Sequence, residues 1–186
     1  MFVSARRILF VAAAVTAGFM PTGGAQAATA NATAKANVLK PLVMTGGGTV
    51  DFGTIVTPST ASFSGTFSID AAASQTSSYC ASGFACSGTP AAAMFNLQGS
   101  NNNNITLTIP TTVTLTLQGA TGTPPTLIFA TKNSIAANSG NGNYTMQLPN
   151  SGSPGLNFYV GGSVTIDQAT VGGSYQGTFT VTADYQ

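Results

Sequence analysis

Few side chains in this sequence of 186 residues can carry out chemistry. It has five basic residues, four acidic residues and no histidine, and all four acidic residues are aspartates. Proton transfer in enzymes usually needs histidine or paired carboxylates, and zinc sites need clusters of cysteine, histidine or carboxylate ligands. The sequence therefore predicts a protein that is not an enzyme, uses no cofactor and holds no metal.

The two cysteines, Cys80 and Cys86, are the residues whose spacing indicates a covalent role. A redox motif has two residues between its cysteines, whereas this pair has five, and a zinc site would need further ligands. In an exported protein, a close and even pair of cysteines is typical of a disulfide. We predict that Cys80 and Cys86 form a structural disulfide.

Residues 1–27 have the features of a secretory signal peptide. Arg6 and Arg7 come before an apolar run at residues 8–20, and small residues end the segment. The run is shorter than the roughly 20 apolar residues that span a bilayer. We expect cleavage before Ala28, and we expect the mature chain not to be anchored in a membrane by itself.

The charge of the mature chain argues against a polyanionic partner. After cleavage, three lysines and four aspartates remain, so the net charge is −1. Proteins that bind nucleic acid neutralise several phosphates with lysine and arginine. The sequence therefore predicts that the protein does not bind nucleic acid.

The elements of the mature chain follow a period of two residues, which is the period of β-strands. Apolar residues alternate with threonine and serine, and glycine, asparagine and proline separate the runs. Short strands are expected at residues 49–56, 63–69, 94–98, 105–109, 113–117, 126–130, 144–148, 156–160 and 163–166. The glycine pairs at 161–162 and 172–173 are expected to form turns. This pattern predicts an all-β fold, an antiparallel β-sandwich that forms one domain over residues 38–186.

The two ends of the mature chain carry the longest alternating patterns. At the start, small apolar residues occupy every second position, namely Ala28, Ala30, Ala32, Ala34, Ala36 and Val38. At the end, the corresponding positions are Tyr175, Gly177, Phe179, Val181, Ala183 and Tyr185, which predicts one long strand with an apolar face. The unpaired edge of such a strand must be covered. The N-terminal segment, residues 28–37 with Val38, could cover it in its own molecule or in a neighbouring one.

The C-terminal pattern resembles that of chaperone-usher pilus subunits of Gram-negative bacteria. Tyr185 is the penultimate residue and Gly173 is fourteenth from the end, as in the signature of that family. Residues 38–53, with Lys40-Pro41-Leu42 and Asp51-Phe52-Gly53, also resemble small secreted proteins of unknown function that are regarded as pilin-like.

The resemblance implies a fold and a function. The fold would be an immunoglobulin-like sandwich that lacks its last strand and is completed by a donated strand. Residues 28–37 and Val38 would be the donor, and the strand from Gly173 to Tyr185 would line the acceptor groove. The protein would be a structural fimbrial subunit, exported through the periplasm to the cell surface of a Gram-negative bacterium and used in adhesion or biofilm formation.

The partners that this resemblance implies are identical or homologous subunits, a periplasmic chaperone and an outer-membrane usher. An alternative stays open, in which the chain is a self-complemented, monomeric extracellular β-sandwich that binds a ligand or partner.

Overall fold

The structure is a computed structural model that describes residues 27–135, 142–149 and 155–186. Residues 1–26 of the predicted signal peptide lie outside these ranges. The chain divides into two units, Met1–Asn37 and Val38–Gln186, which we describe separately. In the first unit, the described residues 27–37 belong to no strand and are all exposed.

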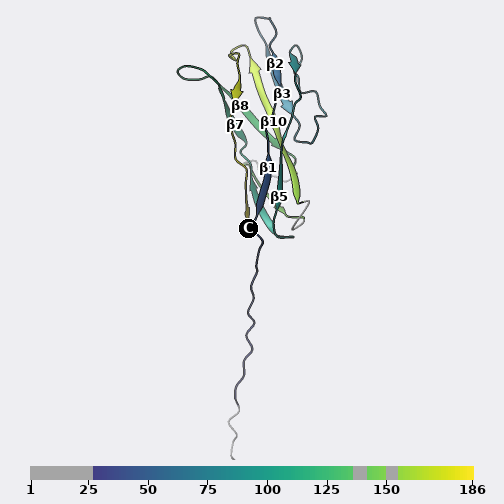
Figure 1. Ribbon diagram of the computed structural model, residues 1–186, viewed down its shortest axis with the longest axis vertical. Helices are drawn as coiled ribbons and strands as arrows, with labels where there is room; N and C mark the ends of the chain where they lie inside the picture. Colours follow the sequence, from purple (N-terminus) through teal and green to yellow (C-terminus); the bar gives the residue numbers. More distant parts are fainter. Residues whose placement is uncertain (1–26, 136–141, 150–154) are drawn as a thin grey trace, which may run out of the picture. The chain divides into compact units, whose positions relative to one another are not determined.

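The second unit is an all-β fold, and no helix occurs among the described residues (Figure 1). The strands are β1 (Val43–Gly47), β2 (Thr54–Val56), β3 (Ser64–Ile69), β4 (Ala85–Ser87), β5 (Ala93–Gln98), β6 (Asn104–Thr108), β7 (Thr112–Leu117), β8 (Thr126–Asn133), β9 (Asn143–Gln147), β10 (Leu156–Asp167), β11 (Tyr175–Gln176) and β12 (Thr182–Tyr185). All strand pairs are antiparallel. The predicted antiparallel β-sandwich is therefore confirmed.

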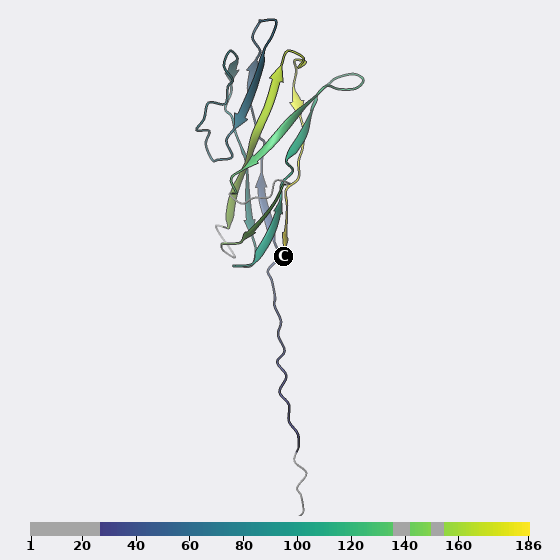
Figure 2. The same cartoon turned by 180° about the vertical axis from the view of Figure 1, so that it is seen from behind.

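The largest sheet is built around β10. Its order is β1-β5-β10-β8-β7-β11, and β3 pairs with the second half of β10 on the same side as β5 (Figures 1 and 2). The expected turn at Gly161 and Gly162 is wrong, because both residues lie inside the 12-residue strand β10. A Cβ at Gly162 would lie 2.6 Å from the ring of Phe129. Glycine is needed here because the flanking strands approach closely, not because the chain turns.

Two smaller sheets lie against the inner face of the large one. One has the order β12-β6-β9, and the other consists of β2 and β4. The chain passes from the small sheet to the large sheet between β6 and β7, at Pro110 and Thr111. Proline has no backbone N–H to donate to a ladder, so the pairing of β6 ends there. Sequence alternation predicts these two strands correctly, but it does not predict that they belong to different sheets.

The core has two parts. The first lies between the large sheet and the β12-β6-β9 sheet, and its fully buried residues include Leu97, Ile105, Leu107 and Phe158. The second lies between the other half of the large sheet and the segments around β2 and β4, and its members are Phe67, Val113, Phe129 and Val164. Threonine and serine occupy most of the outward positions of the same strands, as the period of two requires.

The predicted disulfide is present. Cys80 and Cys86 are bonded, with their Cα atoms 5.9 Å apart. The loop that they close carries Phe84, whose ring packs edge-to-face on Phe67 with centroids 5.0 Å apart. A Cβ at Gly65 would lie 2.8 Å from the Cβ of Ala81 and still closer to the ring of Phe84. The loop therefore closes the second part of the core.

Candidate functional site

The C-terminal run, residues 175–185, is the candidate functional site. The prediction of one continuous strand is wrong, because the run contains two short strands in different sheets. β11 pairs with β7 in the large sheet, and β12 pairs with β6 in the small sheet. Residues 177–181 between them belong to no strand. The run pairs with both β6 and β7, and these two strands lie in different sheets. It therefore passes from one sheet to the other beside the β6–β7 connection.

Both strands of the C-terminal run lie at sheet edges. β11 is the last strand of the large sheet, and β12 is the first strand of the small sheet. Each therefore has backbone groups on one side that pair with no other strand of the domain described here. Unpaired strand edges of this kind are templates for the addition of another strand.

The apolar face of the C-terminal run is only partly covered. Tyr175, Phe179, Val181, Ala183 and Tyr185 are half-buried, whereas the residues between them and Gly177 are exposed. The paired strand β6, by contrast, buries Ile105 and Leu107 completely. The alternation predicted from the sequence is thus present, but the apolar side chains of the run are half-buried and not fully buried.

Phe179 lies where the run changes sheets. Its side chain packs against both parts of the core, and its ring centroid is 6.4 Å from that of Phe129. A surface cavity of about 440 Å³ lies beside it, lined by Pro110, by residues 112–114 and by residues 178–180. The open stretch 177–181 therefore borders a concave surface next to the core.

Tyr185 fastens the end of the run to the beginning of the domain. Its hydroxyl accepts a hydrogen bond from the backbone N–H of Ser100 at 2.5 Å and donates one to the carbonyl oxygen of Lys40 at 2.8 Å. The backbone N–H of Lys40 in turn donates to Ser100 Oγ at 2.6 Å. The sequence assigned Tyr185 to the groove wall, but no local pattern indicated these partners.

Gly173 comes just before the C-terminal run. Its φ of +150° is one that glycine adopts readily, and a Cβ at this position would overlap the side chain of Leu117 in β7. The expected turn at 172–173 agrees with the structure in that both residues lie in the irregular connection between β10 and β11. Gly173 allows this connection to pass closely over β7.

The residues of the candidate donor segment lie in the other unit, apart from Val38. Ala28, Ala30, Ala32, Ala34 and Ala36 are exposed, and Val38 has 89% of its surface exposed. A valine this exposed buries almost none of its apolar surface within the chain. The side chains that the sequence singles out as a donor face are therefore available for contact.

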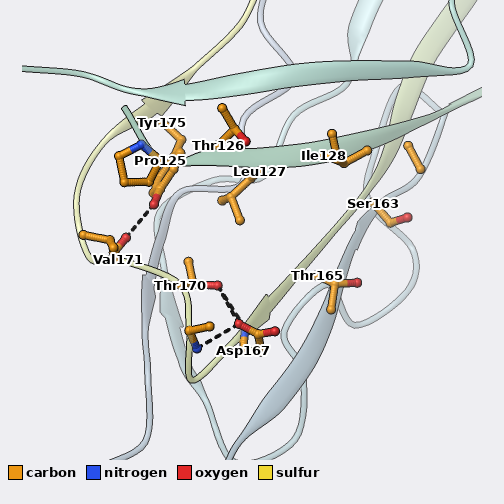
Figure 3. A pocket seen from close by; sticks show the side chains of 12 residues that line it. Pro125, Thr126, Leu127, Ile128, Ser163, Thr165, Asp167, Thr170, Val171 and Tyr175 are labelled. Carbon is orange, nitrogen blue, oxygen red and sulfur yellow. Dashed lines mark hydrogen bonds between the residues drawn. The ribbon is translucent and has the colours of Figure 1, made fainter. Parts of the chain in front are cut away.

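A second concavity, which the sequence did not indicate, lies on the outer side of the large sheet (Figure 3). It has a volume of about 520 Å³ and lies between strands β8 and β10 and the connection that follows β10. Asp167 lines it, and its Oδ1 accepts hydrogen bonds from Ala169 N at 3.0 Å and Thr170 Oγ1 at 3.1 Å. Tyr175 donates from its hydroxyl to the carbonyl oxygen of Val171 at 2.7 Å. These bonds hold the connection at both ends.

Two further aspartates, Asp51 and Asp70, also accept hydrogen bonds from backbone N–H groups. Asp51 Oδ1 accepts from Gly53 N at 2.8 Å. Asp70 accepts from the backbone N–H and the hydroxyl groups of Thr76 and Ser77, and these bonds lower the pKa of its carboxyl to about 2. Within the described ranges, no group of three His, Cys, Asp or Glu residues could hold a metal ion. The carboxylates of Asp51 and Asp70 thus stabilise loops.

The described part of the chain has no helix with the length and apolar character to cross a membrane. None of the curated proteins or solved structures compared with the chain matches it. A family described as a domain of unknown function, DUF4402, matches residues 42–185, a range that includes all twelve strands of the described residues. Because the match covers more than half of the sequence, the chain belongs to the DUF4402 family.

Proposed function

We propose that this protein is a structural subunit of a surface fimbria, assembled when each subunit donates its N-terminal segment to the next. The observation that carries the proposal is the C-terminal run, which lies at the edge of two sheets, leaves residues 177–181 outside any strand and covers its apolar face only partly. In this proposal the domain is an immunoglobulin-like sandwich that lacks one strand. An extended segment with a matching apolar face would complete it.

Residues 28–38 have the properties that such a donor needs. The segment and the C-terminal run are equal in length, 11 residues each, and both place apolar side chains at every second position, apart from Gly177 in the run. The donor side chains are mostly alanine, so each buries little surface. Main-chain hydrogen bonds to the open edge would therefore supply a large share of the binding energy.

The proposal includes the partners and route that the resemblance implies. The subunit is exported through the periplasm of a Gram-negative bacterium, a chaperone covers its open edge there, and an usher exchanges the chaperone for the next subunit. The fibre serves adhesion or biofilm formation, and the subunit itself has no enzymatic role.

The first test is extraction of the fibre in detergent without boiling. We expect a ladder of oligomers that collapses to one band on heating, because strand-donated contacts resist detergent at low temperature. A single monomer band in both samples would contradict the proposal and favour the self-complemented monomer.

A matched pair of substitutions tests the donor face directly. Ala32→Asp places a carboxylate on the face that the proposal buries, whereas Thr33→Asp places the same charge on the opposite face. We expect Ala32→Asp to abolish the ladder and Thr33→Asp to keep it. Equal effects of the two substitutions would show that the alternation has no role in assembly.

Protection of Lys35 from trypsin gives an independent measurement. The predicted mature chain has three lysines and no arginine, and Lys35 lies in the exposed segment. Exposed segments outside strands and helices are cleaved readily. We expect trypsin to cut at Lys35 in free subunits but not in fibres, and rapid cleavage in both would contradict strand donation.

A further inference from the structure

Outward residues of four neighbouring strands lie on one side of the large sheet and form a mostly polar face, which we call the hydroxyl face. It comprises the outward positions of β3, β10, β8 and β7, which alternate with the buried residues of the second part of the core. Most of these positions hold serine or threonine, and Thr66 Oγ1 and Thr165 Oγ1 are 3.1 Å apart across the β3–β10 pair. Each hydroxyl both donates and accepts hydrogen bonds. The face is thus chemically complementary to a copy of itself.

Only two charged side chains lie at the outward positions of these four strands, all of which the structure describes. They are Lys132 in β8 and Asp167 in β10, and both residues are exposed. Because Val164 lies opposite Phe129, Lys132 and Asp167 are at opposite ends of the face. Six residues of strand separate them along the strand direction, which is about 20 Å. They are too far apart to pair within one molecule.

Two small residues lie near the midpoint between these charges. Ala130 in β8 is opposite Ser163 in β10, so the centre of the face carries little bulk. Ile128, next to them, has 57% of its surface exposed, and it lines the concavity at the Asp167 end of the face (Figure 3).

We propose that the hydroxyl face pairs with the hydroxyl face of a second copy of this chain about a two-fold axis that runs across the strands. Such an axis through the Ala130–Ser163 centre superimposes opposite ends of the two faces. Lys132 of each copy then reaches Asp167 of the other, and its long side chain enters the concavity of about 520 Å³. The two hydrogen bonds that the carboxylate of Asp167 accepts within its own chain both end on Oδ1, and they hold the carboxylate in place for this contact.

The few charges on this face also favour a second copy of this chain as the partner. The face has one positive and one negative residue, so a second copy meets no net repulsion and two opposite charges. This contact uses the outer side of the large sheet, whereas strand donation uses the edges of β11 and β12. The pairing therefore joins subunits side by side and does not depend on the proposed fimbrial function.

Zero-length coupling of amines to carboxylates tests the arrangement directly. Equal amounts of ¹⁴N- and ¹⁵N-labelled mature chain are mixed, treated with a carbodiimide and analysed by peptide mass spectrometry. We expect a Lys132–Asp167 link between light and heavy peptides, because only the proposed contact brings these residues together. A set of links without this one would overturn the proposal.

Charge-reversal variants give the second test, with self-association measured by sedimentation velocity at low and high salt. Lys132→Glu should raise the dissociation constant about tenfold or more, and Lys40→Glu, which makes the same change of charge away from the face, should leave it unchanged. Adding Asp167→Lys to Lys132→Glu should restore association, and Asp167→Asn, which can keep the loop bonds, should weaken it in the wild-type background.

The outcomes separate this proposal from the fimbrial one. Equal association of the Lys132→Glu and Lys40→Glu variants would overturn the two-fold pairing. The heat-sensitive ladder of strand-donated oligomers should be unchanged by Lys132→Glu. A missing ladder together with the Lys132–Asp167 link would instead refute strand donation and support the pairing.

Discussion

Replacing Tyr185 with phenylalanine removes one hydroxyl that joins three segments of the domain. The hydroxyl accepts from Ser100 N at 2.5 Å and donates to the carbonyl oxygen of Lys40 at 2.8 Å, so two hydrogen bonds are lost while the ring stays in place. A typical hydrogen bond contributes about 0.5–1.5 kcal/mol net to stability. Lys40 is exposed and its carbonyl can bind water instead. We therefore expect a loss of about 1–2 kcal/mol in the free energy of unfolding.

The measurement is urea unfolding followed by far-ultraviolet circular dichroism, on monomeric protein and with equal m-values required for the comparison. For a domain of this size the loss corresponds to a decrease in Tm of about 2–8 °C. Tyr175→Phe is the matched control, because it removes one hydroxyl bond, to Val171 in a surface connection. If Tyr185→Phe is no more destabilising than Tyr175→Phe, the hydroxyl of Tyr185 does not hold the end of the C-terminal run as described here.

Three further perturbations test other parts of the domain. The pKa of Asp70 in the folded protein is about 2, below its ordinary value of 3.8, so its contribution to stability is complete above about pH 4 and is lost as the pH falls towards 2. Asp70→Asn should flatten the decline of Tm over this pH range. An unchanged decline would show that Asp70 does not contribute to it. Reduction of the Cys80–Cys86 disulfide opens a loop of seven residues and should cost about 2.4 kcal/mol, measured as a lower urea midpoint. Phe179→Ala should cost about 2 kcal/mol, which is less than for a fully buried phenylalanine because this side chain is half-buried; a loss below about 0.5 kcal/mol would show that it does not link the two parts of the core.

Sequence alternation located most strands well, because the direction of successive side chains in a strand depends only on the local backbone. The expected strands at 63–69, 94–98, 105–109, 113–117 and 126–130 all appear with small differences at their ends. Two expectations differ from the structure. The strands expected at 156–160 and 163–166 are one strand, β10, and of residues 49–56 only 54–56 form a strand, while Asp51 makes an isolated bridge to Ala91. Glycines with positive φ precede residues 49–56 at 46–48 and lie among them at 53, and they interrupt the regular backbone.

The candidate site was predicted in part. The alternating residues of the C-terminal run were identified, but its division between two sheets was not, because the division follows the change of sheet between β6 and β7, about 70 residues earlier in the chain. The glycines at 161–162 were assigned to a turn because local rules do not register the neighbouring strands that crowd them. The partners of the Tyr185 hydroxyl and the shared face of Lys132 and Asp167 depend on contacts between distant residues, so no local pattern contains them.

The amino-acid sequence by itself determined the all-β class of the fold and the disulfide, because its period of two dictates strands and its two cysteines are closely spaced. Tertiary structure alone decided which strands became neighbours, which edges stayed open and which charges came to lie on one face. The physical reason is that side-chain alternation arises from the geometry of a single strand, whereas pairing and register arise from contacts between residues far apart in the chain.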